Sequence, residues 1–197
     1  MKRVGWSLLH DALEIWDTGR FGLGVFATRS ISPGEILCVM GGQVADISLE
    51  NAASPLSIRY NVDFSEECSF CPLDESQIPL MPQLLFNHSC RPNCGFLDSQ
   101  TIVAIRPISK GEECRYDYAF CMWNSDLSAS HFEMKCGCGE TECRGVVRED
   151  DWMLESIQAS YGRWFMPFLR RKWEGEALSE PKYMGSDGAS PSQDLPR

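Results

Sequence analysis

The chain has 197 residues, of which 43% are hydrophobic, and a net charge of -10 at pH 7. This length and composition predict one main globular domain with extensions, large enough to form a buried core. The negative charge argues against non-specific nucleic-acid binding, which requires a basic face, so we expect no direct nucleic-acid binding. No apolar run of signal-peptide or membrane-span length occurs. We therefore expect an intracellular protein, nuclear or cytoplasmic, with no membrane segment.

Short alternating or apolar segments separated by turns occupy most of the first two thirds of the chain. They are residues 13–16, 25–27, 36–40, 57–64, 95–97, 101–105 and 113–118. Two of the intervening turns, residues 31–35 and 107–112, are similar in sequence. Frequent turns with almost no helical periodicity predict an irregular, mostly β domain.

Helices are predicted only near the C-terminus. Asp150 and Asp151 are placed to cap a helix whose apolar residues recur at helical spacing through Tyr161. Gly162 interrupts this pattern, and residues 164–173 predict a second short helix. Beyond it, Gly, Ser, Pro and acidic residues dominate, which predicts a disordered tail over residues 175–197.

The stretch from Leu85 to Cys94 concentrates polar chemistry. It holds two asparagines, a histidine and two cysteines in ten residues, and Pro92 fixes a bend. Neither a strand nor a helix pattern fits, so we expect a rigid, polar, partly buried loop whose donors and acceptors need partners. Asn87-His88-Ser89 also matches a glycosylation acceptor, but this interpretation requires secretion, which we do not expect.

Ten cysteines in a reducing compartment indicate metal binding more often than disulfides. Cys136, Cys138 and Cys143 form a C-x-C-x4-C pattern with glycines that permit tight turns. A structural zinc needs four ligands, so one more must come from elsewhere, and Cys90 and Cys94 are both candidates. Cys68 and Cys71 form a C-x2-C pair, which we interpret as ordinary thiols rather than a second metal or redox site.

Four motifs then occur in a familiar order. They are Arg20-x-Gly22-x-Gly24-Val25-Phe26-Ala27, Asn87-His88-Ser89-Cys90-x-Pro92-Asn93-Cys94, Gly111-Glu112-Glu113-x-x-Tyr116-Asp117-Tyr118 and Cys136-x-Cys138-x4-Cys143-Arg144-Gly145. In this combination the chain resembles SET-domain protein-lysine N-methyltransferases with a post-SET zinc motif, of the small stand-alone type without a pre-SET region. The resemblance implies a mostly β SET-domain fold with a pseudoknot over residues 8–121. A post-SET zinc segment (132–148), a C-terminal helical extension (149–174) and the disordered tail (175–197) would follow.

The resemblance also implies roles for individual residues. The S-adenosylmethionine pocket would be lined by Gly22, Leu23, Gly24, Asn87, His88 and Tyr118. Zinc would be held by Cys90, Cys136, Cys138 and Cys143, which leaves Cys94 out. Tyr118 would be the catalytic tyrosine, with Tyr116 on the wall of the lysine channel and Tyr60 flanking the lysine stem.

The function implied is methylation of a lysine amine in a protein substrate, either a histone tail or a non-histone protein, to the mono- or dimethyl state. Two departures from the family pattern lie near the expected clefts. Val39-Met40-Gly41-Gly42 stands where Tyr-x-Gly-Glu is usual, and Leu84-Leu85 stand where an arginine is usual. They leave a second hypothesis open, a non-catalytic, zinc-stapled SET module that binds a peptide or protein partner.

Overall fold

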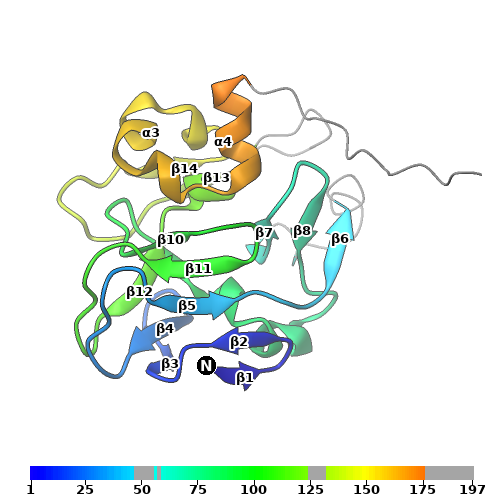
Figure 1. The fold of residues 1–197 in the computed structure, drawn as a ribbon, viewed down its shortest axis with the longest axis vertical. Helices are drawn as coiled ribbons and strands as arrows, with labels where there is room; N and C mark the ends of the chain where they lie inside the picture. The colour runs from blue at the N-terminus through cyan, green and yellow to red at the C-terminus, as the bar shows by residue number, and fades with distance from the viewer. Residues whose placement is uncertain (47–55, 57–58, 124–131, 176–197) are drawn as a thin grey trace, which may run out of the picture.

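The fold is strand-rich, as predicted, and the computed structural model describes residues 1–46, 56, 59–123 and 132–175. Figure 1 shows the N-terminal strands at one end and the C-terminal helices at the other. One sheet has the order β1-β2-β5-β11-β10 and a second β3-β4-β12-β9. The first contains β1 (Lys2–Val4), β2 (Ser7–Leu9), β5 (Ile36–Val39), β10 (Cys94–Phe96) and β11 (Thr101–Ala104). The second contains β3 (Leu13–Asp17), β4 (Leu23–Ala27), β9 (Asn87–His88) and β12 (Glu113–Tyr116).

Two smaller sheets complete the strands. The order β6-β8-β7 joins β6 (Val44–Asp46), β7 (Val62–Asp63) and β8 (Cys68–Phe70), and β13 (Glu133–Lys135) pairs with β14 (Val146–Arg148). The strand predicted over residues 57–64 is wrong in its extent. Only Val62 and Asp63 are extended, and Leu56 and Arg59 are helical, while residues 57–58 lie outside the described part. Alternation of residue types did not produce a strand here because β7 pairs with β8 over only two residues.

The two turns of similar sequence lie against each other. Ile31 and Ile108 exchange backbone hydrogen bonds of 2.9 and 3.0 Å. In each turn a glutamate accepts a hydrogen bond from the backbone of a serine, Glu35 from Ser32 and Glu112 from Ser109. Each turn also contains a glycine with positive φ. The repeated sequence therefore encodes a matched pair of turns that joins the N-terminal half of the domain to the β12 region.

The stretch around Asn87 is not entirely a loop, contrary to the prediction. Asn87 and His88 form the short strand β9, which runs parallel to β12 with Asn87 opposite Arg115 and His88 opposite Tyr116. Further along, the Ser89 and Asn93 backbone N–H groups donate to the carbonyls of Tyr116 and Arg115 at 3.0 Å. This parallel crossing of two segments distant in sequence positions the site described below.

The helices are short, and the first begins later than predicted. α3 (Glu155–Tyr161) follows a 3-10 turn, η4 (Asp151–Met153), and α4 (Pro167–Glu174) follows another, η5 (Gly162–Trp164). Asp151 does not cap a helix because its carboxylate accepts a hydrogen bond from Arg144 at 3.1 Å. The remaining 3-10 turns are η1 (Glu75–Leu80), η2 (Pro82–Leu85) and η3 (Tyr118–Phe120). Within the described residues, no helix has the length and apolarity to cross a membrane.

Candidate active site

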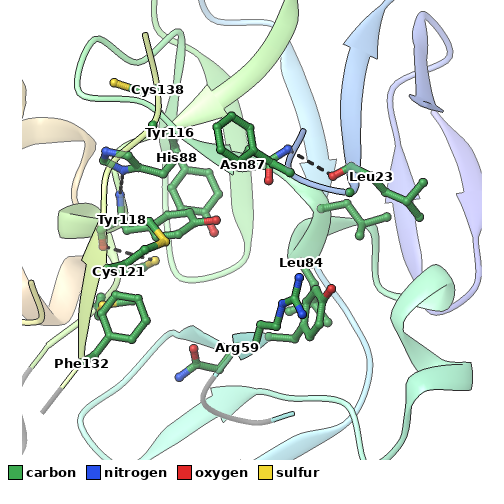
Figure 2. Close-up of a pocket in the computed structure, with 18 of the residues that line it drawn as sticks. Leu23, Arg59, Leu84, Asn87, His88, Tyr116, Tyr118, Cys121, Phe132 and Cys138 are labelled. Atoms are coloured by element: carbon green, nitrogen blue, oxygen red, sulfur yellow. Dashed lines mark hydrogen bonds between the residues drawn. The ribbon is translucent and has the colours of Figure 1, made fainter. Parts of the chain in front are cut away.

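A cavity of about 430 Å³ lies where β9, β12 and the segment after β13 meet. Its walls come from the turn after β3, the segment entering β7, the end of η2 and the strand β9. β12, η3 and the cysteine-rich segment complete it. Figure 2 shows Leu23 and Asn87 on one side of this cavity and Tyr116, Tyr118 and Cys121 on another. Segments far apart in sequence thus meet around this one cavity.

Gly24 allows the backbone of β4 to approach Asn87 closely. A Cβ at this position would lie 2.5 Å from Oε1 of Glu113 and 3.0 Å from Nδ2 of Asn87. Nδ2 of Asn87 donates to the carbonyl oxygen of Leu23 at 3.1 Å and to Oε1 of Glu113 at 2.7 Å. The two donors of the amide are therefore held by the protein, which orients the Asn87 side chain at the cavity wall.

His88 is buried and neutral. Its Nδ1 accepts a hydrogen bond from the backbone N–H of Tyr118 at 3.2 Å, which assigns the ring proton to Nε2, 3.3 Å from Sγ of Cys90. Burial lowers the pKa of His88 to about 4, although the nearby Asp117 carboxylate opposes the shift. The imidazole and the ring of Tyr118 meet edge to face at 5.2 Å. His88 thus links the cavity to the cysteine cluster.

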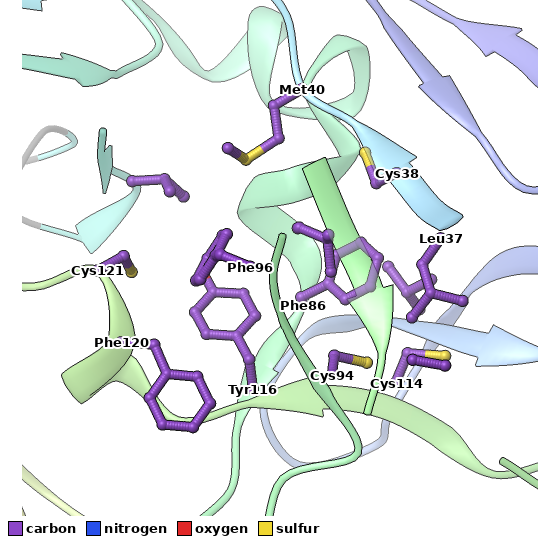
Figure 3. Packing of buried hydrophobic residues seen from close by; sticks show 14 of the residues in the cluster. Leu37, Cys38, Met40, Phe86, Cys94, Phe96, Cys114, Tyr116, Phe120 and Cys121 are labelled. Atoms are coloured by element: carbon purple, nitrogen blue, oxygen red, sulfur yellow. The ribbon is translucent and has the colours of Figure 1, made fainter. Parts of the chain in front are cut away.

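Tyr116 and Tyr118 occupy different environments. Tyr116 is 2% exposed and packs edge to face on Phe96 at 5.0 Å, within the core shown in Figure 3. Tyr118 begins η3 instead of extending β12 to residue 118 as predicted, because the Asp117 side chain accepts a hydrogen bond from the N–H of Ala119. Burial raises the pKa of both tyrosines above the ordinary value. Both hydroxyls therefore stay protonated at neutral pH.

Four cysteines come together beside the cavity. The Sγ atoms of Cys90, Cys136, Cys138 and Cys143 all lie within 4.8 Å of one another. Burial raises the pKa of Cys138, but hydrogen bonds from the backbone of Cys90 and Glu140 outweigh this effect and lower it to about 7. Four converging thiols, one with a stabilised thiolate, fit the donor set of a structural zinc site. Cys94 is fully buried elsewhere, donating to Oδ1 of Asn93.

Polar contacts hold the segment from Cys136 to Cys143, called the cysteine segment below, against β12 and the residues that follow β9. Glu140 accepts hydrogen bonds from Arg115 at 2.8 Å and from the Ser89 hydroxyl at 3.1 Å. Arg115 also donates to the carbonyl of Cys138 at 3.0 Å. A Cβ on Gly137 would lie 2.9 Å from both Arg20 and Phe21, so this segment lies directly on the turn after β3. It forms one wall of the cavity.

The structure places most of the predicted residues together. The cavity is lined by Tyr60, Gly22, Leu23, Asn87, His88, Tyr116 and Tyr118. Gly24 lies behind the wall, where it permits the approach of Asn87. Cys68 and Cys71 belong to no metal-binding group among the described residues. Sequence reasoning missed Asp63 and Cys121, which also line the cavity; the signal for Asp63 was an acid between two apolar residues, Val62 and Phe64.

Two departures from the family pattern, at Leu84-Leu85 and at Gly42, have structural explanations. Leu84 and Leu85 line the cavity with apolar surface. A Cβ on Gly41 would lie 2.3 Å from the Trp6 carbonyl, and one on Gly42 2.9 Å from Met81. Gly42 also has a φ of 131°, which favours glycine. The glycine pair is therefore explained by close packing with β2 and η2.

Comparisons with known proteins agree with this architecture. The SET domain family model matches residues 22–119. The chain is 32% identical over 177 residues to histone-lysine N-methyltransferase ASHR3 of Arabidopsis thaliana, covering 81% of this chain and 33% of the relative. It is 37% identical over 100 residues to histone-lysine N-methyltransferase ash1 of Drosophila melanogaster, covering 47% of this chain and 4% of the relative. The chain thus spans a third or less of the length of these two relatives.

A solved structure shows the same fold. The methyltransferase domain of human histone-lysine N-methyltransferase SETMAR superposes with a TM-score of 0.54 at 19% identity, covering 70% of this chain and 58% of that one. At this identity the likeness supports the fold alone. The family match, the two relatives and the fold agree, and the chain belongs to the SET-domain family.

Proposed function

We propose that this chain transfers a methyl group from S-adenosylmethionine to a lysine side chain of a protein, with mono- or dimethyllysine as the product. The observation that carries the proposal is the convergence of Asn87, His88, Tyr116 and Tyr118 on one cavity bounded by the glycine turn at Gly22. A module that only binds a partner does not need a pocket for a cofactor.

Residues on one side of the cavity suit the cofactor. S-adenosylmethionine, when bound, supplies a sulfonium methyl group. The backbone of Gly22 and Leu23, with the amide of Asn87 and the region of His88, would hold it. The fixed orientation of the Asn87 amide and the close packing at Gly24 support this assignment, because both preorganise the wall before any ligand binds.

Residues on the other side suit a lysine. A free lysine amine has a pKa near 10.4 and is a nucleophile only when neutral. Aromatic walls tolerate its cation, and tyrosine hydroxyls orient its neutral form. We assign Tyr118 to the reacting methyl, Tyr116 to the amine and Tyr60 to the lysine stem. Since Tyr118 stays protonated at neutral pH, its role is alignment and electrostatic stabilisation rather than general-base catalysis.

We further propose that Cys90, Cys136, Cys138 and Cys143 bind one structural zinc ion. The zinc would fix the segment that contributes Met134, Gly137 and Cys138 to the cavity wall. Loss of the metal would therefore disorder one side of the active site as well as the cysteine loop.

The substrate is a protein lysine, and a histone tail is one candidate because two relatives are named histone-lysine N-methyltransferases. The net charge of -10 suits a basic substrate of either histone or non-histone origin. Mass spectrometry after incubation with isotope-labelled S-adenosylmethionine tests this on purified core histones and on whole-cell extract. Labelled methyllysine is expected in at least one of the two preparations.

Calorimetry separates the enzyme from the non-catalytic module. Titration with S-adenosylmethionine should give a saturable heat with one site per chain. No heat at millimolar cofactor, from a protein that retains its metal, would favour the binding module instead.

A further inference from the structure

A buried acid lies in the same cavity as the two tyrosines. Asp63, in β7, is 5% exposed and lines the cavity. Its backbone is held by pairing with Ser69 of β8, and its Oδ1 accepts a hydrogen bond from Nδ2 of Asn61 at 3.2 Å. None of the proposed roles uses this carboxylate. Because Asp63 lines the cavity, its side chain can contact a ligand that enters this space.

Tyr116, in β12, and Cys121, at the end of η3, line the same cavity as Asp63. Both side chains are buried in the core seen in Figure 3, and the Cys121 thiol donates to the carbonyl of Tyr118 at 3.8 Å. Burial raises the pKa of both groups, and the nearby charge of Asp63 adds to both shifts. Tyr116 and Cys121 are therefore neutral at pH 7.

None of the other ionisable groups that the structure describes on the cavity wall is a carboxylate. Besides the tyrosines and cysteines, they are Arg20, Arg59, His88 and Lys135. Among the described residues that line the cavity, Asp63 is the one carboxylate. A cationic side chain that enters this space therefore has one carboxyl group to meet, and that group lines the same cavity as the tyrosine assigned to the amine.

We propose that Asp63 is a catalytic residue that receives the substrate lysine as its ammonium ion and accepts one proton from it. The inference rests on the proposed methyl transfer. One N–H bond of the ammonium breaks and one O–H bond forms on the carboxylate, which leaves a neutral amine with a free electron pair. After the amine is methylated and the product leaves, Asp63 releases its proton to solvent.

The chemistry of lysine explains why such a residue is useful. Near pH 7.4 only about one free lysine in 1000 is neutral, so a channel that admits the neutral amine alone would lose most encounters. A buried carboxylate admits the abundant cation. Removing both charged groups from water disfavours both charged forms, which favours proton transfer between them.

Binding of n-butylammonium, which reproduces the end of a lysine side chain, tests the docking step without any protein substrate. Chemical-shift titration with n-butylammonium chloride should show saturable binding to the wild-type protein near Tyr116. Asp63→Asn should weaken this binding about tenfold or more, the usual worth of a hydrogen bond to a charged group. Glu66→Gln is the matched control, because it makes the same charge change just beyond β7 at a residue that pairs with Lys172.

A comparison on the wild-type protein alone guards against misfolding of the Asp63→Asn variant. Uncharged 1-butanol should bind at least about tenfold more weakly than n-butylammonium, since it lacks the charge that a carboxylate recognises. Equal binding of the two probes, binding of neither, or undiminished binding of n-butylammonium to folded Asp63→Asn would overturn the proposal.

The pH dependence of turnover tests the proton transfer. If Asp63 accepts the proton of the substrate ammonium, kcat/KM of the wild-type enzyme should be nearly independent of pH between about 6.5 and 8.5. The reactive state is then the ammonium ion paired with the carboxylate, and both forms are abundant over this range. Asp63→Asn must select the neutral amine, so its kcat/KM should rise about tenfold per pH unit. Parallel profiles would overturn the proton transfer. Absence of turnover in the wild-type enzyme would instead count against the proposed function, while the n-butylammonium result would still decide docking.

Discussion

Arg144 donates hydrogen bonds to both carboxylate oxygens of Asp117, and the Nη2 to Oδ1 distance is 2.8 Å. The same guanidinium bonds the Asp151 carboxylate through Nε at 3.1 Å, and the Arg144 backbone N–H lies 3.4 Å from Sγ of Cys90. Asp117 and Asp151 are nearly fully buried. One arginine thus joins the SET motif, the cysteine segment and the C-terminal extension.

Arg144→Gln should therefore destabilise the fold strongly, because it leaves two buried carboxylates without their cation. Breaking a buried ion pair costs about 3–5 kcal/mol, and urea unfolding in the presence of zinc measures the change. Arg148→Gln is the matched control, because the Arg148–Glu133 pair is about half exposed. Surface pairs contribute about 0–1 kcal/mol. Equal losses in the two variants would contradict a structural role for the buried pair.

We predict that each chain binds one zinc ion. Elemental analysis should give one zinc per wild-type chain and a near-complete loss in Cys136→Ser, because three remaining thiols cannot close a tetrahedral structural site. Cys68→Ser should keep the metal, since Cys68 belongs to no metal-binding group among the described residues. Two zinc ions per chain, or retention in Cys136→Ser, would contradict the ligand assignment.

Removal of the C-terminal tail should leave activity intact, although residues 176–197 lie outside the part of the chain that the structure describes. Gly175 adopts φ 71° and its N–H bonds carbonyls in the last turn of α4, so a chain that ends at Gly175 keeps its helix cap. Thermal unfolding and turnover should match the full-length protein.

A chain that ends at Met166 provides the contrast. It lacks Phe168 and Leu169, which are buried in the core, and each fully buried side chain of this size contributes roughly 1.5–3 kcal/mol. Lys172, whose ammonium lies 4.2 Å from the Trp123 ring centroid, is lost as well. If this shorter chain were as stable as the chain ending at Gly175, α4 would have no structural role.

Local sequence patterns predicted much of the fold and many residues of the site. The hairpin between β10 and β11, the similar turns and the cysteine spacing each involve residues close in sequence, and each could be predicted. The helix start could not, because the Asp151 carboxylate is bound by Arg144, and no local pattern reveals that competition. For Asp63, the local signal of an acid between two apolar residues does not reveal what the side chain lies near. Its neighbours Tyr116 and Cys121 are more than fifty residues away, and only the folded chain brings them together.

Tyr118→Phe should lower kcat by about 100-fold or more while the affinity for S-adenosylmethionine changes little. The hydroxyl is assigned to the reacting methyl, and loss of an interaction made mainly in the transition state lowers kcat without weakening ground-state binding. Calorimetry and single-turnover kinetics measure the two quantities. Tyr161→Phe is the control, since Tyr161 packs against Phe120 at 5.6 Å and does not line the cavity. A fully active Tyr118→Phe together with an inactive Tyr116→Phe would show that the roles of the two tyrosines are reversed.

Tyr116→Phe should change the product rather than abolish the reaction. Tyr116 lines the cavity, and its hydroxyl is assigned to the space that a methylated amine needs in order to rotate. Its removal enlarges the channel by one oxygen atom, while the ring stays packed between Phe86 and Phe96. Intact-mass analysis should show a shift from mono- and dimethyl toward trimethyllysine at comparable total turnover. An unchanged product distribution would mean that other residues limit the volume around the amine, and an inactive Tyr116→Phe would move the catalytic role to Tyr116.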